Sequence, residues 1–302
     1  MPRAARNVPA ATMLAEVMLS ARPGPGDIAV DCTIGGGGHA LALLERLRPG
    51  GRLIGIDLDA AELARTNARV SDAGFGPDVF IARHASFADL PSVLAGEGVG
   101  GADLIVADLG VSAMQIEAPD RGFSYKGVGP LDMRMDPSRG EPASALLARA
   151  SAAELAGLLD EYGDEPHARL IADLLADARP ATTHGAERVV RVGLNSARPD
   201  LTRADVKMSI RRTFQALRIA VNDEIGALDA LLQALPSCLR PGGRAVILTF
   251  HSGEDRRVKK AFQAGARRGV YREIARRVIR PSAGEIRANR RVSSAKLRWA
   301  IR

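Results

Sequence analysis

Short apolar runs alternate with stretches of helical spacing over the first third of this chain. The run at 102–108 is apolar enough to be buried on both faces, as in a central strand of a parallel sheet. Repeated strand and helix indicate an α/β fold with a parallel, doubly wound sheet. The expected strands are 27–30, 52–57, 78–82 and 102–108, and the expected helices are 40–47 and 60–70.

The pattern changes after Gly110. Residues 111–140 are rich in Gly, Pro and charge and have little periodicity, which predicts a long loop. Residues 144–212 have helical spacing instead. Breaks in this spacing occur near Gly163, Pro180 and Pro199. We therefore expect an inserted helical subdomain.

The α/β pattern resumes beyond the insertion. A strand is expected at 244–250 and a final strand around Trp299, where apolar residues alternate. We expect 1–111 and 213–302 to form one domain and 112–212, the loop and helical insertion, to form another. A single helix with one apolar stripe is expected from Phe214, Leu217, Val221, Leu228, Leu232 and Leu235.

Four consecutive glycines, Gly35 to Gly38, lie between the first expected strand and the first expected helix. Such a turn lets the backbone approach a nucleotide or a nucleotide-like cofactor. Gly35, Gly37 and Ala40 fit the glycine pattern of dinucleotide sites, and Asp57 follows Gly35 by 22 residues, where a ribose-binding acid is expected.

Asp31 shifts this interpretation toward a cationic cofactor. A carboxylate at the entry of the glycine turn repels a pyrophosphate and favours a cation. S-adenosylmethionine carries an ammonium and a sulfonium, so it is the cofactor we expect, with Asp57 on the ribose hydroxyls and Phe87 against the adenine. The alternatives are a helix N-cap for Asp57, core packing for Phe87 and a helix-start role for His39.

Composition and charge narrow the class of protein. The chain has 302 residues, of which 46% are hydrophobic, and no run approaches the roughly 18 apolar residues of a membrane span. The N-terminal sequence has no apolar export segment, so we expect a cytoplasmic protein without a membrane partner. The two cysteines, Cys32 and Cys238, lie far apart, which suggests neither a disulfide nor a metal site.

Positive charge is concentrated near the C-terminus. Residues 256–302 contain sixteen Lys or Arg and two Glu, a balance of +14, whereas the whole chain carries +7. The other 255 residues therefore sum to −7. A basic segment on an acidic body favours a polyanionic partner such as a nucleic acid, and a solvated basic tail is the alternative.

Asp108 ends the last strand before the insertion, at the edge of a parallel sheet where ligands bind. Several distinctive motifs follow the glycine turn and this residue. They are 111–115, 121–125, 129–136, 212–224, 250–256 and 294–298. Together with 31–40 they resemble the bacterial small-subunit (16S) ribosomal RNA cytosine-N4 methyltransferase family.

The resemblance implies a class I, Rossmann-like methyltransferase fold and methyl transfer from S-adenosylmethionine to the N4 amine of a decoding-centre cytidine. The implied partner is the ribosomal RNA of the small subunit, recognised by the 112–212 insertion, and a homodimer is one candidate state. The chain departs from the family pattern at Asn7–Ala10, Met114, Met208–Arg211 and Gly253. The implied cofactor contacts are Gly37, Gly38, His39, Asp57, Phe87, Asp108 and Gln115.

The proposed chemistry needs a proton acceptor and a stacking surface, because a cytosine amine is a weak nucleophile and its base must be held out of the RNA. Asp108 is the candidate acceptor. Phe123, Tyr125 and Phe250 are candidates for stacking, and core packing is the alternative for all three. Arg121, Arg134 and His251 are candidates for phosphates or base edges. An ion pair of Arg134 with Asp132 or Asp136 is the alternative.

Three other functions remain open at this point. The chain could methylate another RNA target, because its departures from the family pattern adjoin the expected substrate side. The glycine pattern alone would also suit a nicotinamide-dependent dehydrogenase. The third is a non-catalytic RNA-binding assembly factor that retains the cofactor pocket.

Overall fold

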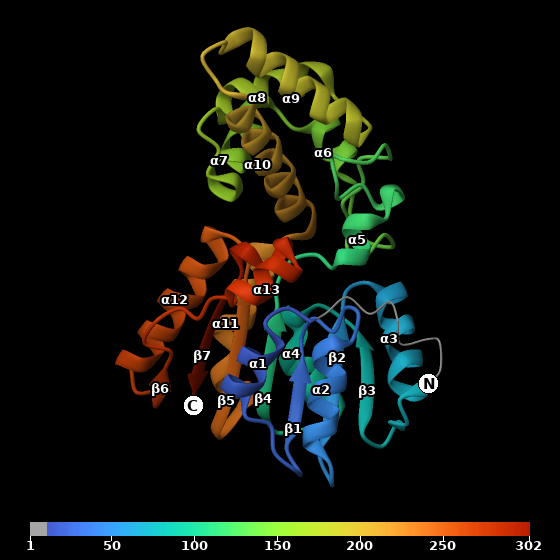
Figure 1. The fold of residues 1–302 in the computed structure, drawn as a ribbon, viewed down its shortest axis with the longest axis vertical. Helices are drawn as coiled ribbons and strands as arrows, with labels where there is room; N and C mark the ends of the chain where they lie inside the picture. Colours follow the sequence, from blue (N-terminus) through green and yellow to red (C-terminus); the bar gives the residue numbers. More distant parts are fainter. Residues whose placement is uncertain (1–10) are drawn as a thin grey trace. The chain divides into compact units, whose positions relative to one another are not determined.

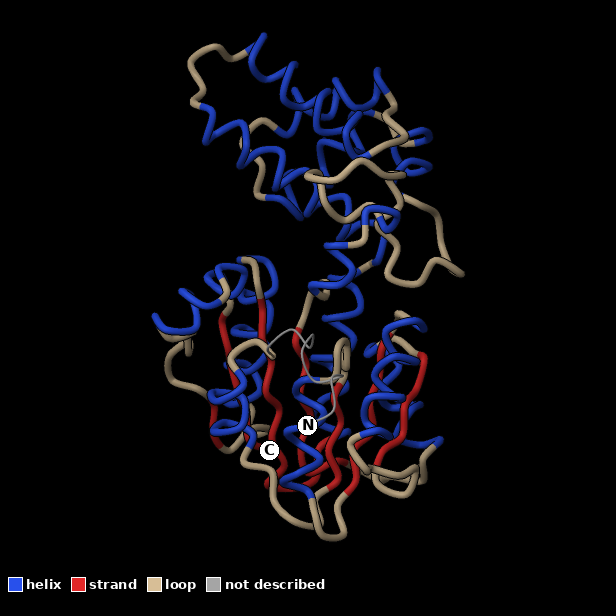
Figure 2. The backbone as a smooth tube through the Cα atoms, turned by 45° about the vertical axis from the view of Figure 1, so that its right-hand side comes forward, coloured by secondary structure: helices blue, strands red, loops and turns tan. Residues whose placement is uncertain are grey.

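The computed structural model describes residues 11–302, so the departure at Asn7–Ala10 lies outside it. The chain divides into two compact units, 1–110 with 225–302 and 111–224. Figure 2 shows strands flanked by helices in the first unit and helices joined by loops in the second. The second unit includes 213–224, which the sequence analysis assigned to the first domain.

A seven-stranded sheet forms the centre of the first unit, in the order β3-β2-β1-β4-β5-β7-β6 (Figure 1). The first five strands in sequence pair in parallel. β7 pairs antiparallel with both β5 and β6, an orientation that alternation alone does not reveal. The strands are β1 Ile28–Asp31, β2 Arg52–Asp57, β3 Phe80–His84, β4 Ala102–Asp108, β5 Leu239–Thr249, β6 Glu273–Ile274 and β7 Lys296–Ile301.

Helices cover both faces of this sheet, which explains why its central strands are apolar throughout. On β4, Leu104 packs into one hydrophobic core and Ile105 into the other. The expected α/β, doubly wound, class I fold is confirmed. The helices are α1 Leu14–Ala21, α2 Gly38–Leu47, α3 Ala60–Asp72, α4 Leu90–Gly96, α11 Glu224–Cys238, α12 Ser252–Arg267 and α13 Ala283–Ala288, with 3-10 turns η2 Phe87–Asp89 and η4 Arg290–Ser294.

The second unit has its own hydrophobic core. Leu159, Ile171, Val190 and Phe214 are buried there, each from a different helix. The predicted helical character of the insertion is confirmed. Its elements are α5 Ala113–Glu117, η3 Pro119–Arg121, α6 Ala143–Arg149, α7 Ala152–Gly163, α8 Ala168–Ala178, α9 Thr183–Ala197 and α10 Arg203–Asn222.

The prediction of one continuous helix through 214–235 was wrong. Asp223 has a left-handed backbone with φ of 46°, and it ends α10 one residue before α11 begins. Phe214 is buried in the core of the second unit, whereas Leu228 is buried in the first. The apolar spacing therefore continued across the break by coincidence, because each helix contributes its own stripe.

No helix among residues 11–302 combines the length and the apolar character that crossing a membrane requires.

Substitutions at Asp223 test the helix break. A residue without a Cβ adopts positive φ freely, so Asp223→Gly should leave the free energy of unfolding unchanged or raise it by up to about 1 kcal/mol. A β-branched residue strongly disfavours this conformation, so Asp223→Val should lower it by more than about 1 kcal/mol. Urea denaturation followed by circular dichroism measures both.

Gln233→Gly provides the control, because Gln233 is exposed within α11 and glycine there should cost about 1 kcal/mol. If Asp223→Gly destabilised the chain as much as this control does, a continuous helix would be the better description.

Candidate active site

Three aspartates end neighbouring strands at one edge of the sheet. Asp31 ends β1, Asp57 ends β2 and Asp108 ends β4. These strands are parallel and adjacent, so their carboxyl ends lie side by side. Thr33, in the following turn, ties two of these ends together: Thr33 N donates to Asp31 Oδ1 (3.1 Å), and Asp108 N donates to Thr33 Oγ1 (2.6 Å).

The three carboxyl groups are shielded from water, and their negative charges repel those of neighbouring acids. Burial raises the pKa of Asp108 to about 8 and that of Asp31 to about 7. Burial also raises the pKa of Asp57 to about 6, although backbone N–H groups of Asp59 and Gly35 act in the opposite direction. Asp31 Oδ2 and Asp108 Oδ1 are buried without a hydrogen-bond partner. A cation at this edge would satisfy both oxygens.

Asp57 binds the glycine turn directly. Its Oδ2 accepts from Gly35 N (2.8 Å) and its Oδ1 accepts from Asp59 N (2.8 Å). The helix N-cap is Asp59, whose side chain accepts from Ala61 N and Glu62 N, so the N-cap alternative for Asp57 is wrong. Each Asp57 oxygen keeps acceptor capacity, because a carboxylate oxygen can accept more than one hydrogen bond.

Contacts within the protein account for two of the four glycines. A Cβ at Gly37 would lie 2.7 Å from Thr66 Cγ2, and a Cβ at Gly38 would lie 2.8 Å from the Ala11 Cβ. Gly35 and Gly37 also have positive φ, 43° and 79°. The turn is thus shaped by α3 and by the segment before α1, as well as by any ligand.

Two residues of α3 hold this turn and were missed by the sequence analysis. The Thr66 hydroxyl donates to Gly35 O, and the Arg69 guanidinium donates to Gly36 O. Thr66 is fully buried on the face that α3 turns to the core, with Leu63 and Val70. A polar residue on an apolar helix face was the available sequence signal.

His39 lies between the turn and Asp108. Its Nε2 donates to Thr12 O (2.9 Å), and its Nδ1 lies 3.9 Å from Asp108 Oδ2. Burial lowers the pKa of His39 below its ordinary 6.5, so the ring is neutral near pH 7. His39 is also the second residue of α2, so the helix-start alternative holds alongside this contact.

The remaining predicted residues of the first unit lie on other elements. Phe87 begins η2 and is partly buried against a hydrophobic core, so the alternative of core packing is observed for it. His251 precedes α12, and its Nε2 lies 3.2 Å from Glu254 Oε1. Glu254 is buried and its Oε2 accepts from Phe250 N (2.8 Å). No role was predicted for Glu254, although an acid three residues into a helix is a capping signal.

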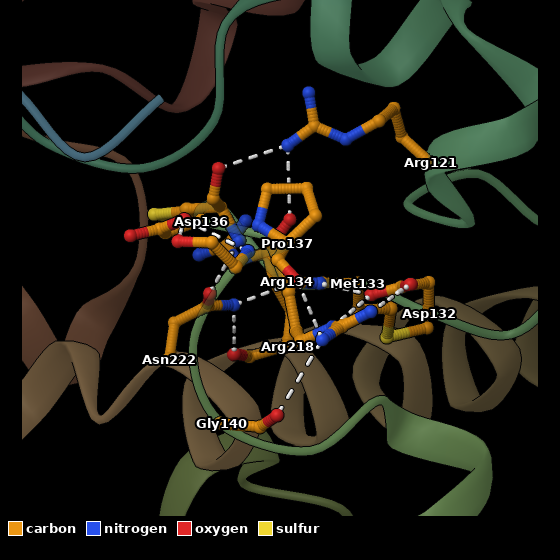
Figure 3. Close-up of polar contacts among 11 residues, drawn as sticks. Arg121, Asp132, Met133, Arg134, Asp136, Pro137, Gly140, Arg218 and Asn222 are labelled. Atoms are coloured by element: carbon orange, nitrogen blue, oxygen red, sulfur yellow. Dashed lines mark hydrogen bonds and ion pairs between the residues drawn. The ribbon is translucent and has the colours of Figure 1, made fainter. Parts of the chain in front are cut away.

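In the second unit the arginines that were predicted to face the substrate hold their own loop. Arg134 binds both oxygens of Asp132 (2.8 Å each), and this hydrogen-bonded ion pair lowers the pKa of Asp132 (Figure 3). Arg121 Nη2 donates to Arg134 O and Met135 O (2.9 Å each). The alternative of a loop-stabilising pair is therefore observed for Arg134.

Asn222, at the end of α10, anchors the same loop and was not singled out from the sequence. Its amide nitrogen donates to Met133 O (2.8 Å), and its amide oxygen accepts from Met135 N (2.7 Å). Met133 is fully buried with φ of 64°, an uncommon backbone conformation for a non-glycine residue. Two hydrogen bonds from one side chain thus fix the residues on either side of Arg134.

The other predicted residues of the second unit also contact their neighbours. Tyr125 makes an edge-to-face contact with Phe214 (5.5 Å between ring centroids), and Arg121 lies 5.7 Å above the Phe123 ring. Gln115 is buried in a capping box with Ser112 at the start of α5. The cofactor role of Gln115 and the substrate roles of the others stay predictions.

The three aspartates at this edge of the sheet form a site that favours a cation. Within residues 11–302 no group of three or more His, Cys, Asp or Glu side chains has the geometry to hold a metal ion. The two unpartnered oxygens, Asp31 Oδ2 and Asp108 Oδ1, lie beside the glycine turn and suit a small organic cation. A nucleoside part would also fit, because its ribose hydroxyls could donate to Asp57.

A family model and curated proteins that are similar in sequence point to the same family. Residues 9–302 match the family model described as the MraW methylase family. The chain is 44% identical over 283 residues to "Ribosomal RNA small subunit methyltransferase H 2" of Alkaliphilus metalliredigens, covering 92% of this chain and 80% of that protein. It is 42% identical over 312 residues to "Ribosomal RNA small subunit methyltransferase H" of an Anaeromyxobacter strain, covering 96% of each. A solved rRNA methylase from Streptococcus thermophilus is 12% identical, with a TM-score of 0.42, over 96% of this chain and 91% of that one.

The raised carboxyl pKa values predict how stability depends on pH. Asp31 and Asp108 have pKa values near 7 and 8 when folded, against 3.8 for an ordinary aspartate, so folding takes up protons. The free energy of unfolding should therefore fall as the pH rises from about 4 to about 8. His39 acts in the opposite sense below its ordinary pKa of 6.5. Between pH 6.5 and about 8, Tm of the chain without cofactor should fall, as measured by calorimetry.

Asp31→Asn and Asp108→Asn should each flatten this slope, because an amide does not titrate. Asp72→Asn is the matched control, since Asp72 is an exposed aspartate at the end of α3, and it should leave the slope unchanged. A wild-type slope in the Asp31 and Asp108 variants would show that these groups are not the source.

Proposed function

The chain belongs to the MraW methylase family, and from this membership we propose that it methylates small-subunit ribosomal RNA with S-adenosylmethionine as methyl donor. The family predicted from the sequence motifs is confirmed. We extend the proposal to the acceptor atom, the N4 amine of a cytidine in the decoding centre. Because ribosomal RNA is the proposed substrate, we also propose a cytoplasmic location.

The observation that carries this proposal is the pair of buried, unpartnered carboxylate oxygens on Asp31 and Asp108. A cationic cofactor relieves the cost of these oxygens, whereas a pyrophosphate would add negative charge to them. For this reason the dehydrogenase alternative suits the site less well. When bound, S-adenosylmethionine supplies an electrophilic methyl group.

In this proposal, different residues of the chain contact different parts of the cofactor. Asp31 and Asp108 face its cationic part, and Asp57 accepts from the ribose hydroxyls. Phe87 lies against the adenine. The backbone at Gly35, Gly37 and Gly38, with His39 and Gln115, borders the rest.

Asp108 is the proposed proton acceptor for the amine. The N4 lone pair is delocalised into the cytosine ring, so the amine must be held in line with the methyl group and must lose a proton as the new N–C bond forms. Burial raises the pKa of Asp108 to about 8 in the protein alone, and the adjacent cationic cofactor would favour the ionised form, which is the form that accepts a proton. On the RNA side, the proposed contacts are Arg121, Phe123, Tyr125, Arg134 and His251.

Methyl transfer can be tested with radiolabelled S-adenosylmethionine. The full chain is incubated with small ribosomal subunits, with their naked RNA and with duplex DNA, and each product is digested to nucleosides. We expect label in N4-methylcytidine from RNA and none from DNA. Label in another nucleoside would leave only the methyltransferase class, and no label in any RNA would refute the proposal.

The role of Asp57 has its own test. Asp57→Ala should weaken S-adenosylmethionine binding by about 1–3 kcal/mol, because charge-assisted hydrogen bonds at a buried site are lost. Asp57→Asn keeps one acceptor oxygen and should lose less. Calorimetric titration measures both, and Tm shows whether each variant is folded. Asp72→Ala, at an exposed aspartate outside the site, is the control; equal affinities in all four proteins would remove Asp57 from the cofactor site.

A further inference from the structure

A hollow of about 410 Å³ lies on the first unit, between α13 and η4. Its lining residues are Ile286, Arg287, Arg290 and Ser293, and we call it the α13 hollow. Its volume falls in the range of small-ligand sites, roughly 300–1,000 Å³. A single phosphate group would not fill it.

The α13 hollow lies at the same edge of the sheet as the three aspartates. η4 leads into β7, and Lys296 of β7 pairs with Thr249, the last residue of β5. Since β5 is parallel to β4, this is the edge at which Asp108 ends its strand. Figure 1 shows α13 at the edge toward which the arrow of β1 points.

A short segment connects the hollow to the glycine turn. Glu285 of α13 accepts a hydrogen bond from Met13 N (2.5 Å), and Thr12 O accepts from His39 Nε2 (2.9 Å). The Ala11 Cβ packs against Gly38, where no side chain fits. Glu285 is thus hydrogen-bonded to backbone and not to the arginines of the hollow, whose two positive charges outweigh its one negative charge.

The two arginines of the hollow differ from the two cations of the neighbouring strand β7. Arg298 and Lys296 both pair with Asp255. Within residues 11–302, Arg287 and Arg290 have neither an ion pair nor a hydrogen bond, and both are exposed. Two unpaired guanidinium groups on one hollow form a site for an anion, and guanidinium matches the geometry of phosphate oxygens.

The rest of the lining specifies the class of anion. The Ser293 hydroxyl can donate to or accept from a phosphate or a sugar, and Ile286 supplies an apolar surface for a base or ribose face. Phosphate with a flat, partly apolar body is the chemistry of one nucleotide. Single-stranded RNA exposes such nucleotides, whereas duplex stacking hides their bases.

We propose that the α13 hollow binds one nucleotide of the substrate RNA, with its phosphate on Arg287 and Arg290 and its base or ribose on Ile286. The proposal rests on the proposed function, which makes RNA the substrate. The site places an RNA strand at the edge of the sheet where the methyl donor is expected.

RNA binding tests the hollow independently of methyl transfer. The affinity of the full chain for a short fluorescein-labelled single-stranded RNA is measured by anisotropy at several salt concentrations. The double variant Arg287→Ala/Arg290→Ala should bind about 10-fold more weakly, and its log–log salt slope should be smaller by about 1 to 1.5, as expected for two lost phosphate contacts. Its Kd for S-adenosylmethionine should be unchanged.

Two further variants separate the hollow from general charge. Arg22→Ala/Arg46→Ala removes two exposed arginines at the opposite edge of the same sheet and should leave RNA affinity near wild type. Arg287→Lys/Arg290→Lys keeps the charge and should restore most of the salt slope. Inorganic phosphate at the same ionic strength should not displace the RNA, because it lacks the nucleoside part.

The outcomes are separable. Wild-type affinity and slope in a folded Arg287→Ala/Arg290→Ala variant would refute the hollow, as would an equal loss in the Arg22→Ala/Arg46→Ala control. Displacement by phosphate alone would reduce the site to a general anion site and overturn the nucleotide assignment. If the wild-type chain bound RNA through the hollow but methylated none, the proposed function would fail and the hollow would stand.

Discussion

The burial of three carboxylates at one edge of a parallel sheet is the constraint on which this molecule depends. The topology places Asp31, Asp57 and Asp108 side by side. Burial removes water from each carboxyl group, which disfavours its charged form. The glycine turn offsets part of this cost, because Gly35 N donates to Asp57 and Thr33 links the other two strand ends. The turn leaves one oxygen each of Asp31 and Asp108 without a hydrogen-bond partner, and these oxygens favour a positively charged ligand. The burial that costs folding free energy is therefore also the source of the proposed cofactor binding.

The sheet could be predicted from the sequence because its pattern is local. The strands at 52–57 and 102–108 were expected at the bounds they have, since each is a short apolar run between turn residues. The helix break at Asp223 could not be predicted, because one left-handed residue interrupts a helix without disturbing the apolar spacing. Thr66 and Arg69 were missed for another reason: they act on Gly35 and Gly36, about thirty residues away. Helical spacing can place Thr66 on the buried face of α3, but it does not show which distant residue its side chain contacts.

The arginines show where residue type stops being informative. Arg134 stands in a distinctive loop and was a natural candidate for the substrate, yet its guanidinium is bound by Asp132 and Pro137 O. Arg287 and Arg290 stand in a segment that the sequence analysis treated only as basic, yet they have no partner within residues 11–302. A guanidinium already paired has little left for a ligand, and pairing is a property of the fold.

The position of β7 has a consequence for the order in which the chain is made. β6 forms hydrogen bonds with β7 and with no other strand of the described sheet, and β7 is synthesised after it. Strands β1 to β4 can pair as soon as they leave the ribosome, whereas β5 exposes one unpaired edge until residues 296–301 emerge. The last strand to be made closes the sheet from within, so a nascent chain passes through a stage with an open apolar edge. During translation this edge is open to misassembly until β7 pairs with β5.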